Sequence, residues 1–160
     1  MQSKTLIPSA AAVLATGVVG GLASRPAQSG WFKRLRKPPY QPPRQVFPIV
    51  WNALYADIAT VSASTLDELE RQGRTEERRR YIAALGANLV LNASWSWLFF
   101  NQRRLGTAAV AAGVLAASSA DLTRRATAAR GKAAAPLALY PLWCAFATVL
   151  SSHIWLLNRR

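Results

Sequence analysis

Cysteine and catalytic motifs are scarce in this sequence, and their scarcity narrows the functions that it can have. The single cysteine, Cys144, cannot form an internal disulfide, and no spacing of cysteine and histidine typical of a zinc site is present. Neither a glycine-rich phosphate loop nor the Ser-His-Asp spacing of a hydrolase occurs. We therefore expect no metal and no other cofactor, and the sequence leans away from an enzyme.

Charge is also scarce in five long stretches, of which three carry none and two carry one carboxylate each, Asp57 and Asp121. Seven Asp and Glu stand against 20 Lys and Arg, for a net charge of +13, yet almost all of these side chains lie between the stretches. Each stretch has 19 to 22 residues, and about 20 apolar residues of helix cross a bilayer core of roughly 30 Å. In order along the chain, the stretches are 5–24, 46–66, 81–101, 105–123 and 136–157.

These stretches predict an all-α integral membrane protein, a single bundle of five transmembrane helices over residues 1–160. A backbone in lipid must satisfy its own hydrogen bonds, which favours helices. A soluble bundle is the alternative, but its helices would carry a charged outer face that the stretches lack. Residues 105–123 are rich in Ala, Gly and Ser and need neighbours to be stable in lipid. Residues 5–24 also resemble a signal peptide, although Ala23-Ser24-Arg25 is a poor cleavage site.

The cationic connecting segments fit a membrane surface better than a nucleic acid. Lys and Arg that flank apolar helices meet anionic lipid head groups, so we expect membrane lipids as partners and no nucleic acid. Five spans would put ten Lys or Arg on each side of the membrane. The positive-inside rule therefore gives no orientation.

Tryptophan is distributed unevenly between the two sides. Five of the six fall on the side of the loop 25–45, while one lies deeper; the five are Trp31, Trp51, Trp95, Trp97 and Trp155, and the deeper one is Trp143. A plain interfacial belt, the alternative explanation, would put aromatic residues at both surfaces. A pocket that opens toward the loop explains the asymmetry, because aromatic faces hold planar apolar ligands by stacking.

Helical spacing places the pocket candidates on single faces of three helices. The three faces are Phe47, Trp51, Tyr55 and Ile58; Asn88, Asn92, Trp95 and Phe99; and Trp143, Ala147, Leu150 and Ile154. Two amides beside aromatic rings suit an apolar pocket with a few polar anchors. The alternative is that the two amides only bind neighbouring helices.

The loop 25–45 is long for a connection between helices. It contains KPPYQPPR at 37–44, and its four prolines favour a stiff extended segment. We interpret this segment as a lid over the aromatic side. A solvated connector is the alternative interpretation.

Three motifs resemble those of the translocator protein family, also called the tryptophan-rich sensory protein, peripheral benzodiazepine receptor or TspO/MBR family. They are KPPYQPPRQVFPIVWNALY at 37–55, LNASWSWLFF at 91–100 and YPLWCAFATVL at 140–150. Their order and spacing resemble the family's over nearly the whole chain.

The resemblance implies a five-helix bundle, usually dimeric, in a membrane, here a bacterial cytoplasmic membrane rather than an organelle outer membrane. It also implies binding of porphyrins, sterols and isoquinoline or benzodiazepine ligands beneath the first loop. Transferred by position, the site would include Trp51, Asn92, Trp95, Trp143 and Ala147, with Pro39 and Tyr40 in the lid. Bacterial members are linked to tetrapyrrole breakdown in light, with tryptophans at the positions of Trp51 and Trp143.

Three positions depart from the family pattern. Some bacterial members have tryptophans where Pro39 and Tyr40 stand, which weakens stacking on a porphyrin here. Ser151 replaces an asparagine of the last helix, and no tyrosine follows Leu150 to complete the proposed sterol motif. The sequence therefore favours porphyrins over sterols.

We carry three functional hypotheses from the sequence. The first is a membrane receptor or carrier for porphyrins and other planar apolar molecules, and the second is an enzyme that degrades bound porphyrin through Trp51 and Trp143. The third is a small ion-coupled transporter that uses the intramembrane carboxylates of Asp57 and Asp121. In the first hypothesis, cations on the aromatic side bind the ligand carboxylates; the candidates are Lys37, Arg44, Arg103 and Arg104.

Small residues on the third helix predict a homodimer. Ala83 and Ala87 lie opposite the Asn92 face, and small side chains let helices approach closely in lipid. Competing small-residue patterns are Gly17-x-x-x-Gly21 and Gly113-x-x-x-Ala117.

Overall fold

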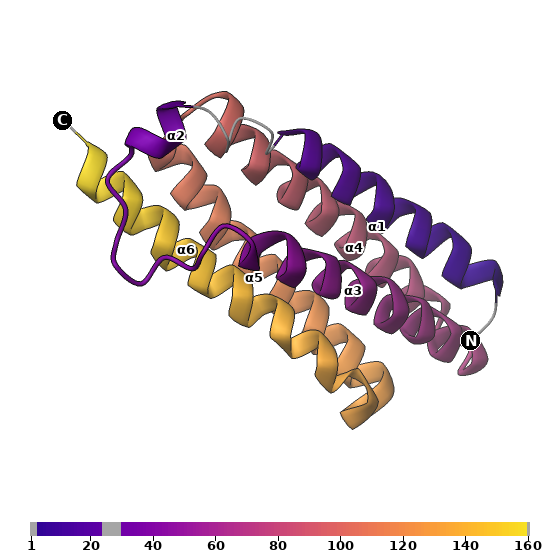
Figure 1. Ribbon diagram of the computed structural model, residues 1–160. Coiled ribbons are helices and arrows are strands. Elements are labelled where there is room, and N and C mark those ends of the chain that lie inside the picture. The colour runs from indigo at the N-terminus through magenta and orange to yellow at the C-terminus, as the bar shows by residue number, and fades with distance from the viewer. Residues whose placement is uncertain (1–2, 24–29, 160) are drawn as a thin grey trace.

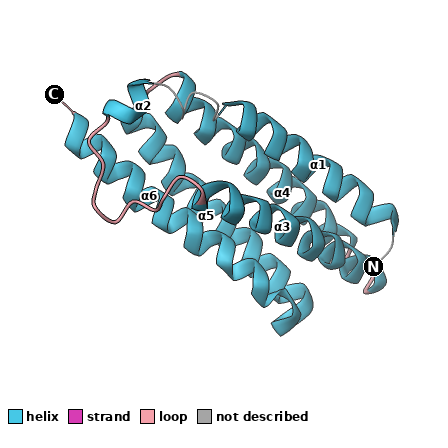
Figure 2. Cartoon of the chain, in the orientation of Figure 1, coloured by secondary structure: helices cyan, strands magenta, loops and turns pink. Residues whose placement is uncertain are grey.

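The computed structural model describes residues 3–23 and 30–159, which form helices joined by loops and contain no strand (Figure 2). The α-helices are α1 Ser3–Ala23, α2 Gly30–Arg34, α3 Val46–Arg71, α4 Thr75–Ser96, α5 Leu105–Arg130 and α6 Leu139–Asn158. A π-helical turn, η2 Trp97–Asn101, continues α4, and a 3-10 helix, η3 Gly131–Ala138, joins α5 to α6. The predicted all-α bundle of five membrane helices is confirmed, with α1, α3, α4, α5 and α6 as its long helices.

Length and composition support a membrane location. Three helical stretches are long and apolar enough to cross a bilayer: Val46–Arg71, Thr75–Asn101 and Leu105–Asn158. The last stretch comprises α5, η3 and α6, which fold back on each other as a pair of antiparallel helices (Figure 1). Ile7–Val19 within α1 is a shorter apolar segment, and α1 as a whole has 21 residues, or about 30 Å of helix.

Successive long helices run in opposite directions, which gives the bundle two distinct ends (Figure 1). One end carries the ends of α1, η2 and α6, the short helix α2 and the loop 35–45 that follows it. We call residues 35–45 the flap and this end the flap end. The other end carries the turn 72–74 and η3, and we call it the distal end.

Small buried side chains let α5 pack closely against its neighbours. Ala108, Ala112 and Ala126 are each at most 2% exposed, and α5 packs against both α4 and α6. Side chains this small permit close backbone approach, which is the main source of helix association in lipid. The weakly apolar stretch 105–123 therefore has the neighbouring helices that it needs to be stable in lipid.

The outward surface of the bundle is apolar. Large aliphatic side chains are exposed on α1, α4, α5 and α6; they include Leu14, Val18, Val90, Val110, Leu142 and Val149. A soluble protein rarely exposes so much apolar surface, whereas a bilayer solvates it well. The surface therefore agrees with the integral membrane location.

Candidate functional site

A cavity of about 440 Å³ lies at the flap end, between α1, α3, α4 and α6. Its aromatic lining consists of Phe32, Phe47, Trp51, Tyr55, Trp95, Phe99 and Phe100. The small or aliphatic lining consists of Gly17, Gly21, Pro48, Ala147, Leu150 and Ile154, and the polar lining of Gln41, Arg44, Asn52, Ser96 and Ser151. An apolar lining with a few polar groups is typical of small-molecule sites.

Aromatic rings form one wall of this cavity. The ring of Trp51 lies 5.6 Å from that of Tyr55 and 6.3 Å from that of Trp95, with interplanar angles of 31° and 34°. Trp95 in turn lies 5.9 Å from Phe99 at 36°. The helical spacing of the sequence accounts for this wall, because residues three or four apart lie on one face of a helix. The wall offers several ring faces to a flat ligand.

Two buried polar atoms at the cavity have no hydrogen-bond partner in the described part of the chain. They are the indole Nε1 of Trp95, a donor, and the side-chain oxygen of Gln41, an acceptor. Buried polar atoms normally find partners, so unpaired ones at a cavity are suited to bind a ligand. A donor and an acceptor are thus in place beside the aromatic wall.

A chain of hydrogen bonds forms the polar floor below the cavity. The Tyr55 hydroxyl donates to Asn92 Oδ1 (3.0 Å), and Asn92 Nδ2 donates to the Tyr140 hydroxyl (3.1 Å). The Tyr140 hydroxyl donates to Asn88 Oδ1 (2.8 Å), and Asn88 Nδ2 donates to the Ser118 hydroxyl (3.1 Å). Both amides therefore join helices, as the alternative interpretation of the sequence expected, and Asn92 reaches the cavity only through Tyr55.

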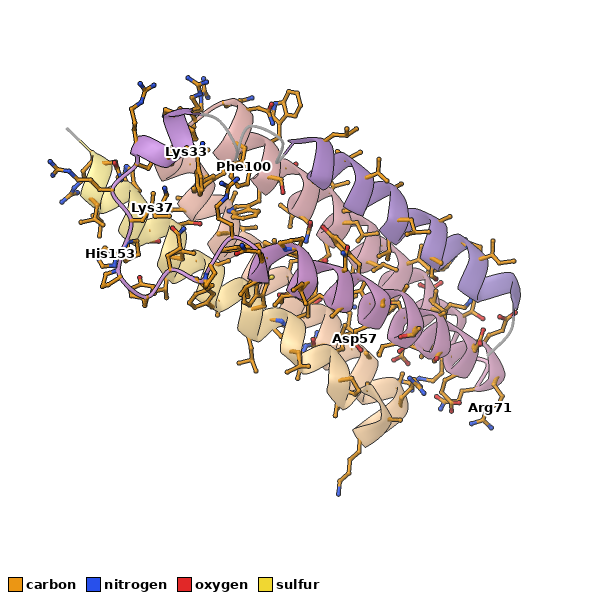
Figure 3. All side chains as sticks on the ribbon, in the orientation of Figure 1. Lys33, Lys37, Asp57, Arg71, Phe100 and His153 are labelled. Atoms are coloured by element: carbon orange, nitrogen blue, oxygen red, sulfur yellow. The ribbon has the colours of Figure 1, made fainter. Side chains whose placement is uncertain are left out.

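The flap is fastened to α6 by polar contacts. The backbone N–H of Arg36 donates to Asn158 Oδ1 (3.0 Å), and Asn158 Nδ2 donates to the Arg36 carbonyl (2.8 Å). The Tyr40 hydroxyl is 3.0 Å from Nδ1 of His153. Figure 3 shows His153 and Lys37 together at this end. These contacts hold a flap whose Gln41 and Arg44 line the cavity.

Cations at the flap end lie against aromatic rings. Lys37 Nζ is 4.4 Å from the centre of the Phe32 ring, and the Arg103 guanidinium is 5.2 Å from that of Trp31. Partial burial, together with the charge of Arg44, holds the pKa of Lys37 below its usual value. Each cation–ring contact adds about 0.5–1 kcal/mol at an exposed site. The contacts hold these two cations against rings at the flap end, outside the cavity lining.

The structure brings only part of the predicted site to the cavity surface. Trp51, Tyr55, Trp95, Ala147 and Arg44 line it, whereas Asn92, Trp143, Tyr40, Arg103 and Arg104 do not. Trp143 packs against Phe47 and Phe146 from behind, and Tyr40 packs on Phe146. Arg104 caps the start of α5 and is exposed.

Several lining residues escaped the sequence prediction. Gln41 lies in the flap and reaches the cavity only through the fold, whereas Asn52 precedes Tyr55 by three residues and Ser96 follows Asn92 by four, so helical spacing could have identified these two. From the sequence, Gly17 was expected only as part of a competing pattern for the dimer interface, yet a Cβ there would lie 3.3 Å from the Tyr55 ring. Its absent side chain lets α1 approach α3 at the cavity wall.

Relatives of the chain are found in mammals and bacteria. The "Translocator protein" of Ovis aries is 32% identical over 154 residues, which covers 94% of this chain and 85% of that protein, and the human protein of that name is 31% identical with the same coverage. The "Tryptophan-rich sensory protein" of Cereibacter sphaeroides is 35% identical over 78 residues, 49% of this chain and 45% of that protein. The TspO/MBR family itself matches residues 9–156. With a family match over nearly its whole length and motifs that resemble the family's in order and spacing, the chain belongs to the TspO/MBR family.

Proposed function

We propose that this chain is a membrane receptor or carrier that binds planar apolar ligands, chiefly porphyrins, in the cavity at the flap end. The observation that supports this proposal most strongly is the wall of tilted rings formed by Tyr55, Trp51, Trp95 and Phe99. The cavity volume of about 440 Å³ falls in the range of small-molecule sites, roughly 300–1,000 Å³. A porphyrin is flat and apolar, so ring faces suit its macrocycle.

The proposed site has a second part that binds the ligand's carboxylates. Arg44 lines the cavity, and Lys37, Arg103 and Arg104 belong to the same end of the bundle. Porphyrin propionates paired with a guanidinium would gain charge-assisted hydrogen bonds. A sterol has no carboxylate and no conjugated ring system to stack on aromatic side chains, so this arrangement favours porphyrins.

Residues behind the cavity complete the proposed site. Trp143 supports Phe47, Asn92 fixes the Tyr55 hydroxyl, and Tyr40 holds the flap against α6. Their substitution would disturb ligand binding through neighbours rather than by loss of direct contact. Ala147 lies on the cavity surface itself, where a larger side chain would reduce the available space.

A spectral titration tests the proposal. The purified protein in detergent is titrated with a dicarboxylate porphyrin, its dimethyl ester and a sterol, and porphyrin absorbance and Trp emission are followed. We expect saturable binding with quenching of Trp emission, tightest for the dicarboxylate. The proposal would be refuted if the sterol bound saturably and neither porphyrin bound.

Light-dependent breakdown of the bound porphyrin is a second candidate, because Trp51 lines the cavity where a porphyrin would bind. The same complex, illuminated, distinguishes the two functions. An enzyme would convert porphyrin to products, and a Trp51→Phe variant would keep the ligand but lose the conversion. A receptor or carrier would leave the porphyrin unchanged.

The transporter hypothesis has less support from the structure. Asp121 forms ion pairs with Arg124 and Arg125, at 2.6 Å each, and so has an evident structural role. Asp57 lies between the two ends, and its Oδ2 is buried without a partner among the described residues (Figure 3). Only Asp57 therefore remains as a candidate for ion coupling.

We further propose that the protein forms a homodimer through α4. Ala83 and Ala87 are exposed on this helix, as is Val90. One glycine of each competing pair serves a contact within the bundle, because Gly17 lies against Tyr55 and Gly113 against Thr148, whereas Gly21 has open space around it. The small face of α4 is therefore the better candidate for contact between chains.

A further inference from the structure

A second cavity, of about 420 Å³, lies at the distal end between α3, α4 and α5. We call it the distal cleft. Its lining holds three guanidinium groups and one carboxylate, together with apolar and phenolic side chains; the residues are Leu69, Glu77, Arg80, Tyr81, Arg124, Arg125 and Ala128. None of these residues belongs to the aromatic site.

The carboxylates near the distal cleft do not neutralise its guanidinium groups. Asp121 accepts one bond from Nη2 of Arg124 and one from Nε of Arg125, at 2.6 Å each. Each guanidinium has five N–H donors, so both keep donors for another acceptor. Glu77 is bound by Arg74, which approaches from outside the cleft lining. Arg74, Arg80, Arg124 and Arg125 with Glu77 and Asp121 give four positive and two negative charges, a net charge of +2.

Arg80 is the cation most available to a ligand. It lines the distal cleft and acts on Glu77 of the same lining only through its charge, because no ion pair joins it to a carboxylate among the described residues. Its neighbour Arg79 differs, because it lies outside the lining, is paired with Glu76 at 3.6 Å, and has a side chain that is 76% exposed. Two adjacent arginines thus offer a matched comparison.

A bilayer that covers the apolar stretches would bring its head groups to the distal cleft. Arg80 directly precedes the uncharged stretch 81–101, and Arg124 directly follows the stretch 105–123. Basic residues at such boundaries attract anionic lipids. Guanidinium groups match the geometry of phosphate oxygens, since they donate in parallel pairs.

We propose that the distal cleft binds the phosphate of an anionic phospholipid head group, with Arg80, Arg124 and Arg125 as its donors. Leu69 and Ala128 form the apolar part of the lining, against which the first carbons of the acyl chains would lie. A soluble phosphate ester has the same phosphate chemistry but lacks the acyl chains that would place it at this depth. Binding here is independent of the aromatic site at the other end.

Native mass spectrometry of the intact protein in detergent tests this proposal. Phosphatidic acid and phosphatidylcholine with the same acyl chains are added at equal concentrations, and the bound fraction of each is compared. We expect preferential retention of phosphatidic acid. Arg80→Gln should weaken that retention about tenfold, which is the usual effect of losing a hydrogen bond to a charged group. Arg79→Gln should change it less than about twofold, as expected for an exposed surface charge.

Two results would overturn the proposal. An equal loss in Arg79→Gln and Arg80→Gln would indicate general surface attraction instead of a site. Displacement of the lipid by an equal concentration of glycerol phosphate would assign the cleft to a soluble phosphate ester. Circular dichroism of both variants checks that the helices are intact, and Arg80→Lys, which keeps the charge, should retain more binding than Arg80→Gln.

Discussion

The flap end and the distal end carry equal numbers of cations but hold them differently. Each side has ten Lys or Arg in the sequence, counted over the loops and chain ends that it carries. At the distal end, ion pairs form with nearby carboxylates, as in Arg71–Glu68 and Arg125–Asp121. At the flap end, three of the cations lie on rings: Lys37 on Phe32, Arg103 on Trp31 and Arg159 on Trp155.

The difference follows from where the acidic residues fall. Residues 25–45, 102–104 and 159–160 contain no Asp or Glu, whereas residues 67–77 contain five. A cation on an aromatic ring keeps its positive charge unneutralised, and it can therefore pair with an anionic ligand. The flap end is thus suited to a carboxylate-bearing planar ligand, and the distal end to stabilisation of helix ends and attraction of lipid phosphates.

Assembly through α4 would leave the aromatic cavity within one chain. We predict that Ala87→Phe converts a dimer to a monomer that still binds porphyrin, because the bulky ring prevents close approach of the small faces. Size-exclusion chromatography with light scattering in detergent measures the change. If Ala87→Phe stays dimeric while Gly21→Phe becomes monomeric, the interface lies on α1 and this assignment is wrong.

The polar floor connects the cavity with the middle of the bundle. Asn92→Leu removes two hydrogen bonds and leaves the Tyr55 and Tyr140 hydroxyls without that amide. Buried unsatisfied groups cost about 1–3 kcal/mol, and interhelical bonds in membranes average about 0.6 kcal/mol. We expect a lower unfolding temperature in detergent. Asn52→Leu, at an exposed position of α3, serves as the control and should leave that temperature unchanged.

The charge of Arg44 in the cavity lining offers a specific test of the difference between the two ends. Arg44→Gln should weaken binding of a dicarboxylate porphyrin by about tenfold, since a charge-assisted bond is lost. Binding of the dimethyl ester should change little, and added salt should reduce the gap between the two ligands. Arg74→Gln at the distal end is the control. Equal affinity of both ligands in the unsubstituted protein, with no effect of salt, would contradict the electrostatic part of the account.

Lys37 should add a small pH dependence. Burial and Arg44 hold the pKa of Lys37 below its usual value, so its charge is present at low pH and is lost as pH rises through that lowered pKa. The affinity for a dicarboxylate porphyrin should therefore begin to fall at a lower pH than it would if Lys37 had the pKa of an ordinary lysine. Lys37→Arg should abolish the effect, because arginine stays protonated. A pH profile that is the same in both proteins would exclude this role of Lys37.

The five helices were predictable because uncharged runs of about 20 residues have few other stable arrangements. The aromatic wall was also predictable, since spacing of three and four puts Trp95 and Phe99 on one face of a helix. Spacing could not show that the Asn92 amide would donate a hydrogen bond to the Tyr140 hydroxyl, because that contact joins residues 48 apart in the sequence. It also could not show the contact of Asn158 with Arg36, which are 122 residues apart. Periodicity identifies which residues share a face of a helix, and only the folded bundle shows which residues of other helices contact that face.

The π-helical turn η2 was likewise not predictable. No glycine or proline marks residues 97–101, yet the N–H of Gln102 bonds the carbonyl of Trp97, five residues earlier. Two residues after the end of η2, Arg103 has a positive φ of 54°. Such turns are frequent at functional sites, and this one carries Phe99 and Phe100 of the cavity lining, of which Phe100 is marked in Figure 3.

Comparison of two tryptophans tests the central claim most directly. Trp51 lines the cavity and contacts both Tyr55 and Trp95, whereas Trp97, also at the flap end, is 52% exposed and lies outside the lining. We predict that Trp51→Ala weakens porphyrin binding by about 1–3 kcal/mol in a spectral titration. Trp97→Ala should leave the affinity unchanged, with both variants fully helical by circular dichroism. Equal affinities in the two variants, or a larger loss in Trp97→Ala, would show that the aromatic residues form an interfacial belt and not a binding site.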